Sequence, residues 1–379
     1  MKPGGIPLTD DHLESRPKQA GFPRRALLLW AAALFLAAIL FWRVHVPLFI
    51  IAPGLTMPAG EIVKVSAEGA VEQERGTFLV TTLAARQASL GTALAAIFDP
   101  RSHVVLRRQL VPPGQTVDEY LAENEELMRQ SQVYAMAAAL DYLGYSPRVT
   151  GAGAEVRRVL PGLRPAGALQ VGDVIVAVDG RPVHLAEDLH DYVASVGEGR
   201  QVAVDFLRDG RRQGGRVETV DDPWTGAGQA RLPVQVWTHR LEVELPPGME
   251  IEIDAREISG PSAGLIFALE IANRFTPVDL TGGRILAGTG TIDARGRLGA
   301  VGGVPLKMMA AMAAGAEAFV MPEAVAAQMD GDRFSMEVLA APDLATLADA
   351  LARRWAGEPA AVPGGGAPGL LWGGFQIDY

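Results

Sequence analysis

Ser259-Gly260-Pro261-Ser262-Ala263-Gly264 is the stretch that decides the fold, because an apolar run typical of a buried helix begins directly after it, at Leu265. The glycines on either side of Ser262 allow a tight backbone turn at the entry to that helix. The first N–H groups of a helix have no intrahelical partner and can bind a developing oxyanion. Ser262 is therefore a candidate nucleophile, and Gly260, Pro261, Ala263 and Gly264 are the candidate turn and oxyanion residues.

The Gly-x-Ser-x-Gly pattern also occurs in the nucleophile elbow of α/β-hydrolases, in which the catalytic histidine follows the serine in the chain. The six histidines here are His12, His45, His103, His184, His190 and His239, and none of them follows Ser262. The order of the residues therefore excludes a Ser-His triad of the hydrolase type.

With histidine excluded, a lysine is the remaining candidate for the general base that activates Ser262. Lys307 is the only lysine after Ser262, and the chain has four lysines among 34 basic residues. A guanidinium cannot give up its proton in a protein, whereas a buried lysine can. Lys307 also lies in the first turn of a helix predicted from Val304 to Ala314, where the helix dipole lowers the pKa of a cation. These properties suit a general base, although a surface lysine not replaced by arginine would look the same.

Four spaced motifs resemble the proteolytic domain of the Lon family, peptidases with a Ser-Lys dyad. They are Gly260-Pro261-Ser262-Ala263-Gly264, Asp279-Leu280-Thr281-Gly282-Gly283, Gly288-Thr289-Gly290-Thr291-Ile292, and Gly302-Gly303 with Lys307. The resemblance covers about Val234 to Trp355. It implies that Ser262 is the nucleophile, Lys307 the general base and Thr289 a support for the lysine. One position departs from it: many Lon proteases have an acidic residue three positions before the serine, where this chain has Ser259.

Composition narrows the range of functions. The net charge of −10 argues against nucleic acid as a partner. The chain has no cysteine, which excludes disulfides, thiolate metal sites and a cysteine nucleophile. It also has no Gly-x-x-x-x-Gly-Lys-[Ser/Thr] phosphate loop, whereas Lon proteases proper carry an ATPase in the same chain. We therefore expect activity without ATP, cofactor or metal, on proteins or peptides that are already extended.

The N-terminal segment predicts a membrane anchor. Residues 26–42 are apolar, and 17 residues are at the lower limit for a span of roughly 30 Å of hydrocarbon. Arg24 and Arg25 precede this run, which places the N-terminus in the cytoplasm. We predict a cytoplasmic tail at 1–25 and a single transmembrane helix at 26–46 in the cell membrane, with the catalytic domain extracytoplasmic. A cleaved signal peptide is the alternative, although no small-x-small site follows the run cleanly.

The middle of the chain predicts two further regions. Residues 53–146 form an N-terminal extracytoplasmic region, with a strand from Gly76 to Leu83 and a helix that begins at a capping box of Thr116 and Glu119. Residues 147–220 read as short strands and hairpin turns. Their run from Leu160 to Gly180 resembles a PDZ domain of the bacterial protease type, which takes a C-terminal peptide as an added strand. That resemblance implies a peptide-binding loop near Gly153, Ala154, Glu155 and Val156.

The predicted fold class is α+β, with a transmembrane helix, a PDZ-like β-rich domain, a Lon-type α/β proteolytic domain at 234–356 and a flexible tail at 357–379. This order resembles a bacterial family of membrane-anchored Lon-like PDZ proteases. It implies a serine endopeptidase acting on extracytoplasmic or membrane-proximal proteins, and a homo-oligomer such as a hexamer. The alternative is a non-catalytic, membrane-tethered PDZ adaptor whose Lon-like domain serves only assembly.

Overall fold

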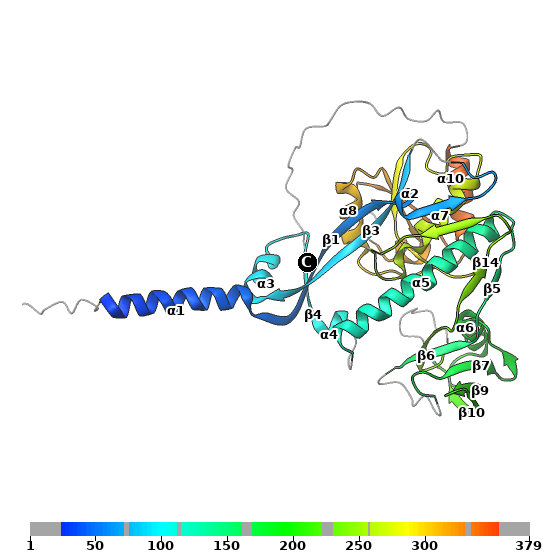
Figure 1. Cartoon of the computed structure of the whole chain (residues 1–379), viewed down its shortest axis with the longest axis horizontal. Coiled ribbons are helices and arrows are strands. Elements are labelled where there is room, and N and C mark those ends of the chain that lie inside the picture. Colours follow the sequence, from blue (N-terminus) through cyan, green and yellow to red (C-terminus); the bar gives the residue numbers. More distant parts are fainter. Residues whose placement is uncertain are drawn as a thin grey trace, which may run out of the picture.

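The computed structural model describes residues 24–71, 76–111, 115–160, 169–221, 230–256, 258–329 and 335–355. The predicted C-terminal tail at 357–379 and the predicted N-terminal tail before Arg24 lie outside the described residues. Figure 1 shows one long helix, α1, that extends away from a body with two lobes, and a second long helix, α5, that runs along both lobes.

A six-stranded sheet lies at the centre of the larger lobe, in the order β20-β19-β16-β3-β1-β4. Its strands are β1 (His45–Pro58), β3 (Thr77–Ser89), β4 (His103–Leu106), β16 (Ile285–Gly288), β19 (Ala318–Pro322) and β20 (Glu337–Ala341). The strands β3, β16, β19 and β20 run parallel, whereas β1 is antiparallel to both β3 and β4. The sheet thus joins strands from the predicted N-terminal region to strands from the predicted proteolytic domain.

Helices cover both faces of this sheet. They are α5 (Val117–Tyr142), α7 (Gly264–Phe275), α8 (Val304–Ala313) and α10 (Leu344–Trp355). Because successive side chains of a strand point to opposite faces, Phe78 and Val80 of β3 pack in one core with α5, α7 and α10, while Leu79 packs in another with α8. The Ser262 helix and the Lys307 helix, α7 and α8, therefore lie on opposite faces of one sheet.

Helix α5 begins at the predicted capping box. The Thr116 hydroxyl accepts the backbone N–H of Glu119, and a Glu119 carboxylate oxygen accepts the backbone N–H of Thr116 at 2.8 Å. The predicted pairing of Thr116 with Glu119 is confirmed, and it fixes the start of the longest helix in the described chain.

The smaller lobe is a second sheet, in the order β10-β9-β7-β6-β13, with β8 paired to β7. Its elements are β6 (Ala154–Val159), β7 (Val174–Val178), β8 (Arg181–Pro182), α6 (Ala186–Val196), β9 (Gln201–Arg208), β10 (Arg211–Glu218) and β13 (Val234–Thr238). Both predicted hairpin turns are present, with positive φ at Asp179-Gly180 and at Asp209-Gly210. The end strand β13 comes from beyond the predicted PDZ range of 147–220.

Short elements complete the described chain. The two-stranded pairs are β2 (Val63–Ser66) with β15 (Glu250–Ile253), β5 (Arg148–Thr150) with β14 (Glu242–Glu244), β11 (Val220–Asp221) with β12 (Ala230–Arg231), and β17 (Thr291–Ile292) with β18 (Leu298–Gly299). The short helices are α2 (Ala59–Ile62), α3 (Leu90–Ile97), α4 (Arg107–Leu110), α9 (Glu323–Ala326) and the 3₁₀ turn η1 (Pro261–Ala263).

Helix α1 (Arg24–Arg43) does not match the predicted anchor at 26–46. The helix ends at Arg43, and the chain enters strand β1 at His45, so the last predicted residues are extended. Within the ranges that the structure describes, no helix combines the length and the apolar character that crossing a membrane requires. The predicted transmembrane helix is therefore not supported.

Candidate active site

Ser262 lies in the 3₁₀ turn η1, directly before α7. The turn is entered through Gly260, whose φ of 84° is one that residues with a side chain rarely adopt. Helix α5 holds the turn from the side: Ser131 Oγ donates to the Pro261 carbonyl at 3.0 Å, and the Gly260 N–H donates to the Asn124 carbonyl at 3.1 Å. The serine is thus positioned by a helix that the sequence did not connect with the site.

Gly264 allows the close approach of α7 to its neighbours. A Cβ at this position would lie 2.5 Å from Ser131 Oγ and 2.9 Å from a methyl group of Ile292. Neither distance is compatible with a side chain at position 264, so the last glycine of the predicted motif is required by packing.

Lys307 is positioned by an equally tight turn. Gly303 precedes α8 in the left-handed conformation, with φ of 68°, and a Cβ there would lie 2.4 Å from Leu83 Cδ1 of β3. The backbone N–H of Lys307 donates to the Gly303 carbonyl at 3.1 Å. A residue without a side chain therefore lets α8 begin against the sheet and directs Lys307 inward.

The three residues predicted for the chemistry meet at one point. Lys307 Nζ donates to Ser262 Oγ at 2.7 Å and to Thr289 Oγ1 at 2.8 Å. Thr289 is fully buried, and Lys307 is only 4% exposed. The Ser262 carbonyl is held by two donors, the Thr289 hydroxyl at 3.0 Å and the Gly290 N–H at 2.8 Å. Thr289 and Gly290 therefore fix both the lysine and the serine backbone.

Burial changes the acidity of the lysine. Removal from water disfavours the charged form and lowers the pKa of Lys307 to about 8. Once Nζ is neutral, the same 2.7 Å contact allows the direction of the hydrogen bond to reverse, so that Nζ accepts the proton of the serine hydroxyl. The first N–H groups of α7 are already used, because Leu265 N–H donates to the Gly290 carbonyl at 3.1 Å and Gly264 N–H donates to the Pro261 carbonyl.

The predicted peptide-binding loop is not a loop. Ala154, Glu155 and Val156 belong to strand β6, which pairs with β13 on one side and with β7 on the other. The Gly153 N–H donates to the His184 carbonyl, and the Gly153 carbonyl accepts the His239 N–H. A peptide could add at these residues only by displacing a strand of the sheet, so this prediction is wrong for them. The two end strands of the sheet are β10 and β13, and β13 is the one that pairs with β6.

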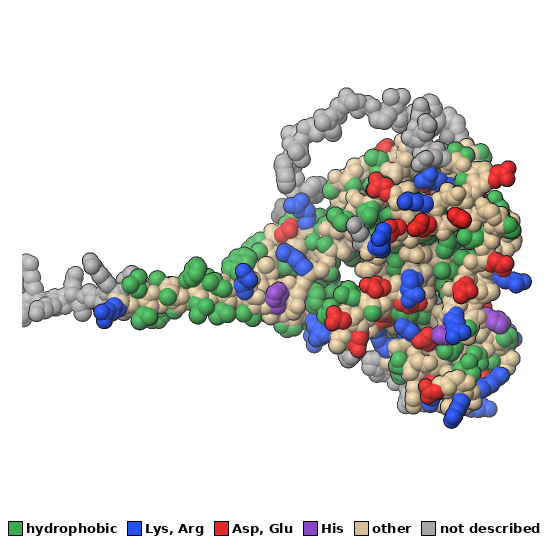
Figure 2. Space-filling view, viewed as in Figure 1, with side chains coloured by type: hydrophobic (Ala, Val, Ile, Leu, Met, Phe, Trp, Pro, Cys, Tyr) green, Lys and Arg blue, Asp and Glu red, His purple; other side chains and the backbone are tan. Residues whose placement is uncertain are grey.

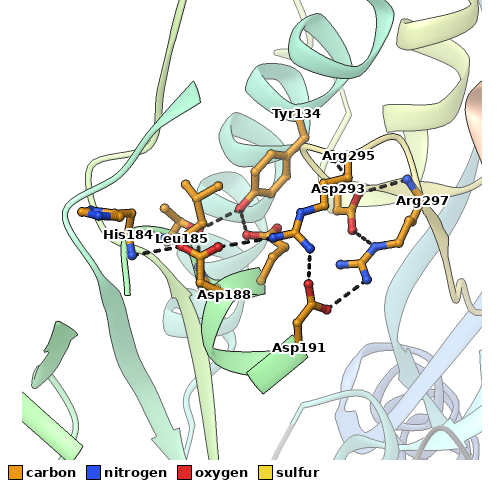
Figure 3. A network of polar contacts seen from close by, with 11 residues as sticks. Tyr134, His184, Leu185, Asp188, Asp191, Asp293, Arg295 and Arg297 are labelled. Atoms are coloured by element: carbon orange, nitrogen blue, oxygen red, sulfur yellow. Dashed lines mark hydrogen bonds and ion pairs between the residues drawn. The ribbon is translucent and has the colours of Figure 1, made fainter. Parts of the chain in front are cut away.

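A polar network joins the two lobes close to this site (Figure 3). Arg297 Nη1 lies 3.0 Å from an Asp191 carboxylate oxygen of helix α6, and Arg295 pairs with the same carboxylate. Arg295 and Arg297 lie in the loop between β17 and β18, which follows Thr289 and Gly290. The sequence did not predict this network, because neither arginine belongs to a motif and their partners lie more than 100 positions away.

Behind these ion pairs, the contact between the lobes is buried. Tyr134 Oη of α5 lies 2.8 Å from Thr238 Oγ1 of β13 and donates to a Glu187 carboxylate oxygen at 3.3 Å. Burial, with repulsion from Asp293 and Asp188, raises the pKa of Glu187. Nowhere in the described ranges do three histidine, aspartate or glutamate side chains gather in a way that could hold a metal ion.

Two family models match parts of the chain. A model of the PDZ domain matches residues 141–219, and a model described as the Lon protease (S16) C-terminal proteolytic domain matches residues 249–335. The chain therefore contains a PDZ domain and a Lon-type proteolytic domain, and Ser262, Thr289 and Lys307 all lie within the second match.

Named relatives are similar over shorter stretches. A probable periplasmic serine endoprotease, DegP-like, of Pseudomonas savastanoi pv. phaseolicola is 30% identical over 128 residues, which are 30% of this chain and 27% of the relative. A protein of the same name from Pseudomonas putida is 40% identical over 63 residues, 16% of this chain and 13% of the relative. The matches thus span well under half the length of these relatives.

Among solved structures, the PDZ domain of the SdrC-like protein from Listeria monocytogenes is 21% identical and covers 24% of this chain and 92% of that chain, with a TM-score of 0.21. A solution structure from Geobacillus thermodenitrificans is 35% identical and covers 19% of this chain and 83% of that chain, with a TM-score of 0.18.

Proposed function

We propose that this chain is an ATP-independent serine endopeptidase in which Ser262 is the nucleophile and Lys307 the general base. The observation that carries the proposal is the 2.7 Å contact between Lys307 Nζ and Ser262 Oγ, made by a lysine that is almost fully buried. The match of residues 249–335 to a Lon-type proteolytic domain supports the same reaction class.

In this mechanism neutral Lys307 takes the hydroxyl proton as Ser262 Oγ attacks the scissile carbonyl. The tetrahedral oxyanion is stabilised at least in part by backbone N–H groups around Ser262. Protonated Lys307 then donates its proton to the leaving amine, and the C–N bond breaks to leave an ester on Ser262. A water molecule attacks that ester with Lys307 again as base, which releases the acid product and restores the serine.

Thr289 positions the lysine lone pair. Its single hydroxyl proton is donated to the Ser262 carbonyl, so Thr289 Oγ1 can only accept from Lys307 Nζ. A neutral lysine that donates one N–H to Thr289 keeps its lone pair for the proton on Ser262 Oγ. Thr289 thus acts through Lys307 as a positioning residue.

Protein substrates are proposed to reach the site with help from the PDZ domain. Peptides that bind PDZ domains add as a strand to a sheet. Of the two terminal strands of this sheet, β10 and β13, β13 is the one that contacts helix α6. We place substrate recruitment at the β13 edge in preference to the interior strand β6.

The extracytoplasmic location and the oligomer are also proposals. Arg24 and Arg25, the first two residues of helix α1, precede its apolar run and favour a cytoplasmic N-terminus. A reporter that is active only outside the cytoplasm, fused after Tyr379, is expected to be active, and activity of a cytoplasm-only reporter would reject this topology. Light scattering of the purified chain should show a homo-oligomer, such as a hexamer, and a monomer at every concentration would reject it.

The peptidase itself is tested with the purified full chain and an unfolded protein such as reduced casein. We expect cleavage that Ser262→Ala abolishes, with new termini identified by mass spectrometry. Lys307→Arg keeps the charge but supplies no base, so it should lose roughly 10²-fold or more. The double variant should lose little beyond either single variant, because the pair acts as a unit. Binding of casein without cleavage by the wild type would favour the non-catalytic adaptor.

A further inference from the structure

Helix α3 buries its small residues and exposes its large apolar ones, which is the reverse of an ordinary surface helix. Its small residues Gly91, Ala93 and Ala96 are buried against the sheet, whereas its large apolar side chains face outward. The exposed fractions are 50% for Leu90, 52% for Leu94, 60% for Ile97 and 79% for Phe98, which directly follows the helix. A soluble surface helix buries its large apolar residues and exposes polar ones, so this face is built to contact something apolar.

The outward face is held rigidly. A capping box fixes the first turn of α3, in which Ser89 Oγ accepts the Thr92 N–H and Thr92 Oγ1 accepts the Ser89 N–H. Ala93 and Ala96 pack in one small core with Ile50 of β1 and Ala88 of β3. The exposure of the large residues therefore does not come from a loosely attached helix.

The apolar surface of α3 is continuous with that of α1. The Trp42 ring packs on Gly91, where a Cβ would lie 2.6 Å from the ring. Helix α1 exposes large apolar side chains along its length, including Leu29, Phe35 and Trp42. Figure 2 shows hydrophobic side chains along the whole of α1 up to the body, with basic and histidine side chains where the helix meets the body.

The charge of this part of the chain differs from that of the whole. Residues 24–58 and 86–110 contain seven arginines and one acidic residue, Asp99, a net charge of +6 within a chain of net charge −10. Arg43, Arg86 and Arg108 are exposed, and none of them has an acidic partner among the residues that the structure describes. An apolar patch bordered by unpaired cations matches an anionic lipid surface, which offers hydrocarbon and phosphate side by side.

We propose that the outer face of α3, formed by Leu90, Leu94, Ile97 and Phe98, inserts into the interfacial layer of an anionic lipid bilayer, with Arg43, Arg86 and Arg108 on the headgroups. This contact is separate from any anchoring by α1, and it does not depend on the catalytic assignment. It fixes the orientation of the folded body on the lipid surface, because α3 connects β3 to β4 and packs on the central sheet.

The test uses the absence of cysteine in the chain. Single variants Leu94→Cys and Phe98→Cys are labelled with an environment-sensitive fluorophore and mixed with vesicles of phosphatidylcholine and phosphatidylglycerol. We expect a blue shift and at least twofold quenching by lipids that carry a quencher in the upper acyl chain. The control is Val171→Cys, an equally exposed apolar position in the PDZ domain, which should show neither change.

Two outcomes would overturn the proposal. The probes at 94 and 98 could remain unquenched although the protein floats with the vesicles, in which case α1 alone holds the lipid. They could also become protected without vesicles as protein concentration rises, which would make this face a contact between copies of the chain.

The charge requirement is tested with the triple variant Arg43→Gln, Arg86→Gln, Arg108→Gln, and a matched triple Arg200→Gln, Arg211→Gln, Arg216→Gln on the PDZ domain. Each arginine near an anionic surface is worth about fivefold in partitioning, so the first triple should need about 100-fold more phosphatidylglycerol-containing lipid for half-maximal quenching at Phe98→Cys. The second triple should behave like the parent. Equal quenching by vesicles with and without phosphatidylglycerol would overturn the anionic assignment.

Discussion

Thr289 Oγ1 donates its only proton to the Ser262 carbonyl across 3.0 Å and accepts a proton from Lys307 Nζ across 2.8 Å. The direction of the second hydrogen bond is therefore fixed by the first. This arrangement leaves the serine hydroxyl as the partner for the lysine lone pair, and it holds the serine backbone at the same time.

Thr289→Val should lower kcat by roughly 10-fold or more, because it removes two buried hydrogen bonds, one to the Ser262 carbonyl and one from Lys307 Nζ, each worth about 1 kcal/mol. KM should change little, since Thr289 is buried and acts through the lysine. Thr289→Ser should restore most of the rate. Thr291→Val, the same change two positions along, is the control, and equal kcat for Thr289→Val and wild type would remove Thr289 from the mechanism.

The activity should depend on pH through Lys307, whose pKa burial lowers to about 8. The general base must be neutral, so kcat/KM should rise with pH through a single ionisation near pH 8 and level off above it. The profile is measured with a peptide substrate between pH 6 and 10, in a range where the fold is intact by circular dichroism. A flat profile across this range would contradict a lysine base.

Gly303→Ala should lower both the melting temperature and the peptidase rate. The left-handed φ of 68° costs a residue with a Cβ roughly 1–2 kcal/mol, and the new Cβ would meet Leu83 at 2.4 Å. Gly302→Ala is the matched control, because its Cβ meets nothing within 4 Å and its φ is ordinary. Equal effects of the two changes would show that the turn does not position Lys307.

Glu187→Gln should stabilise the protein at neutral pH. The pKa of Glu187 is raised in the folded state, mainly by burial, so its stabilising contribution is complete below the ordinary glutamate pKa and is lost as pH rises through the folded-state value. A glutamine cannot ionise, and the melting temperature should therefore rise by a few degrees at pH 7 and not at pH 4. The exposed Glu198→Gln is the control. A gain that is equal at both pH values would contradict this origin.

The residues that meet at the candidate site could be predicted from the sequence because each lies in a local motif. Ser262 and Lys307 each follow glycines that only a tight turn requires, and the structure brings these residues together with Thr289. The roles of Gly260 and Gly303 at positive φ follow from the same patterns. The support from α5 could not be predicted from any local pattern, because Ser131, which donates to the Pro261 carbonyl, lies 130 positions away from it in the sequence.

The arrangement of strands could not be predicted, because it depends on pairing between distant segments. Neither the sequence of β3 nor that of β16 contains a pattern that identifies the other as its partner. The resemblance to PDZ domains implied a peptide loop near Gly153 to Val156, whereas β13, one of the two strands that end the sheet, follows the predicted range of 147–220. The predicted bounds of the anchor, 26–46, followed the apolar residues. Apolar residues also occur in strands, so this pattern could not show that the helix ends at Arg43 and that β1 begins at His45.

The central sheet also determines when the enzyme can form as the chain is made. Thr81 of β3 donates to the carbonyl of Gly288 of β16, 207 positions later, and the whole PDZ domain is synthesised between them. Until β16 emerges, β3 exposes an unpaired strand edge that is open to aggregation. A fragment that began at Val234 would carry Ser262 and Lys307 but lack β3, whose residues Phe78, Leu79 and Val80 pack in the cores beneath both helices. We therefore expect the proposed peptidase to form only late in synthesis, after β16 and α8 have been made.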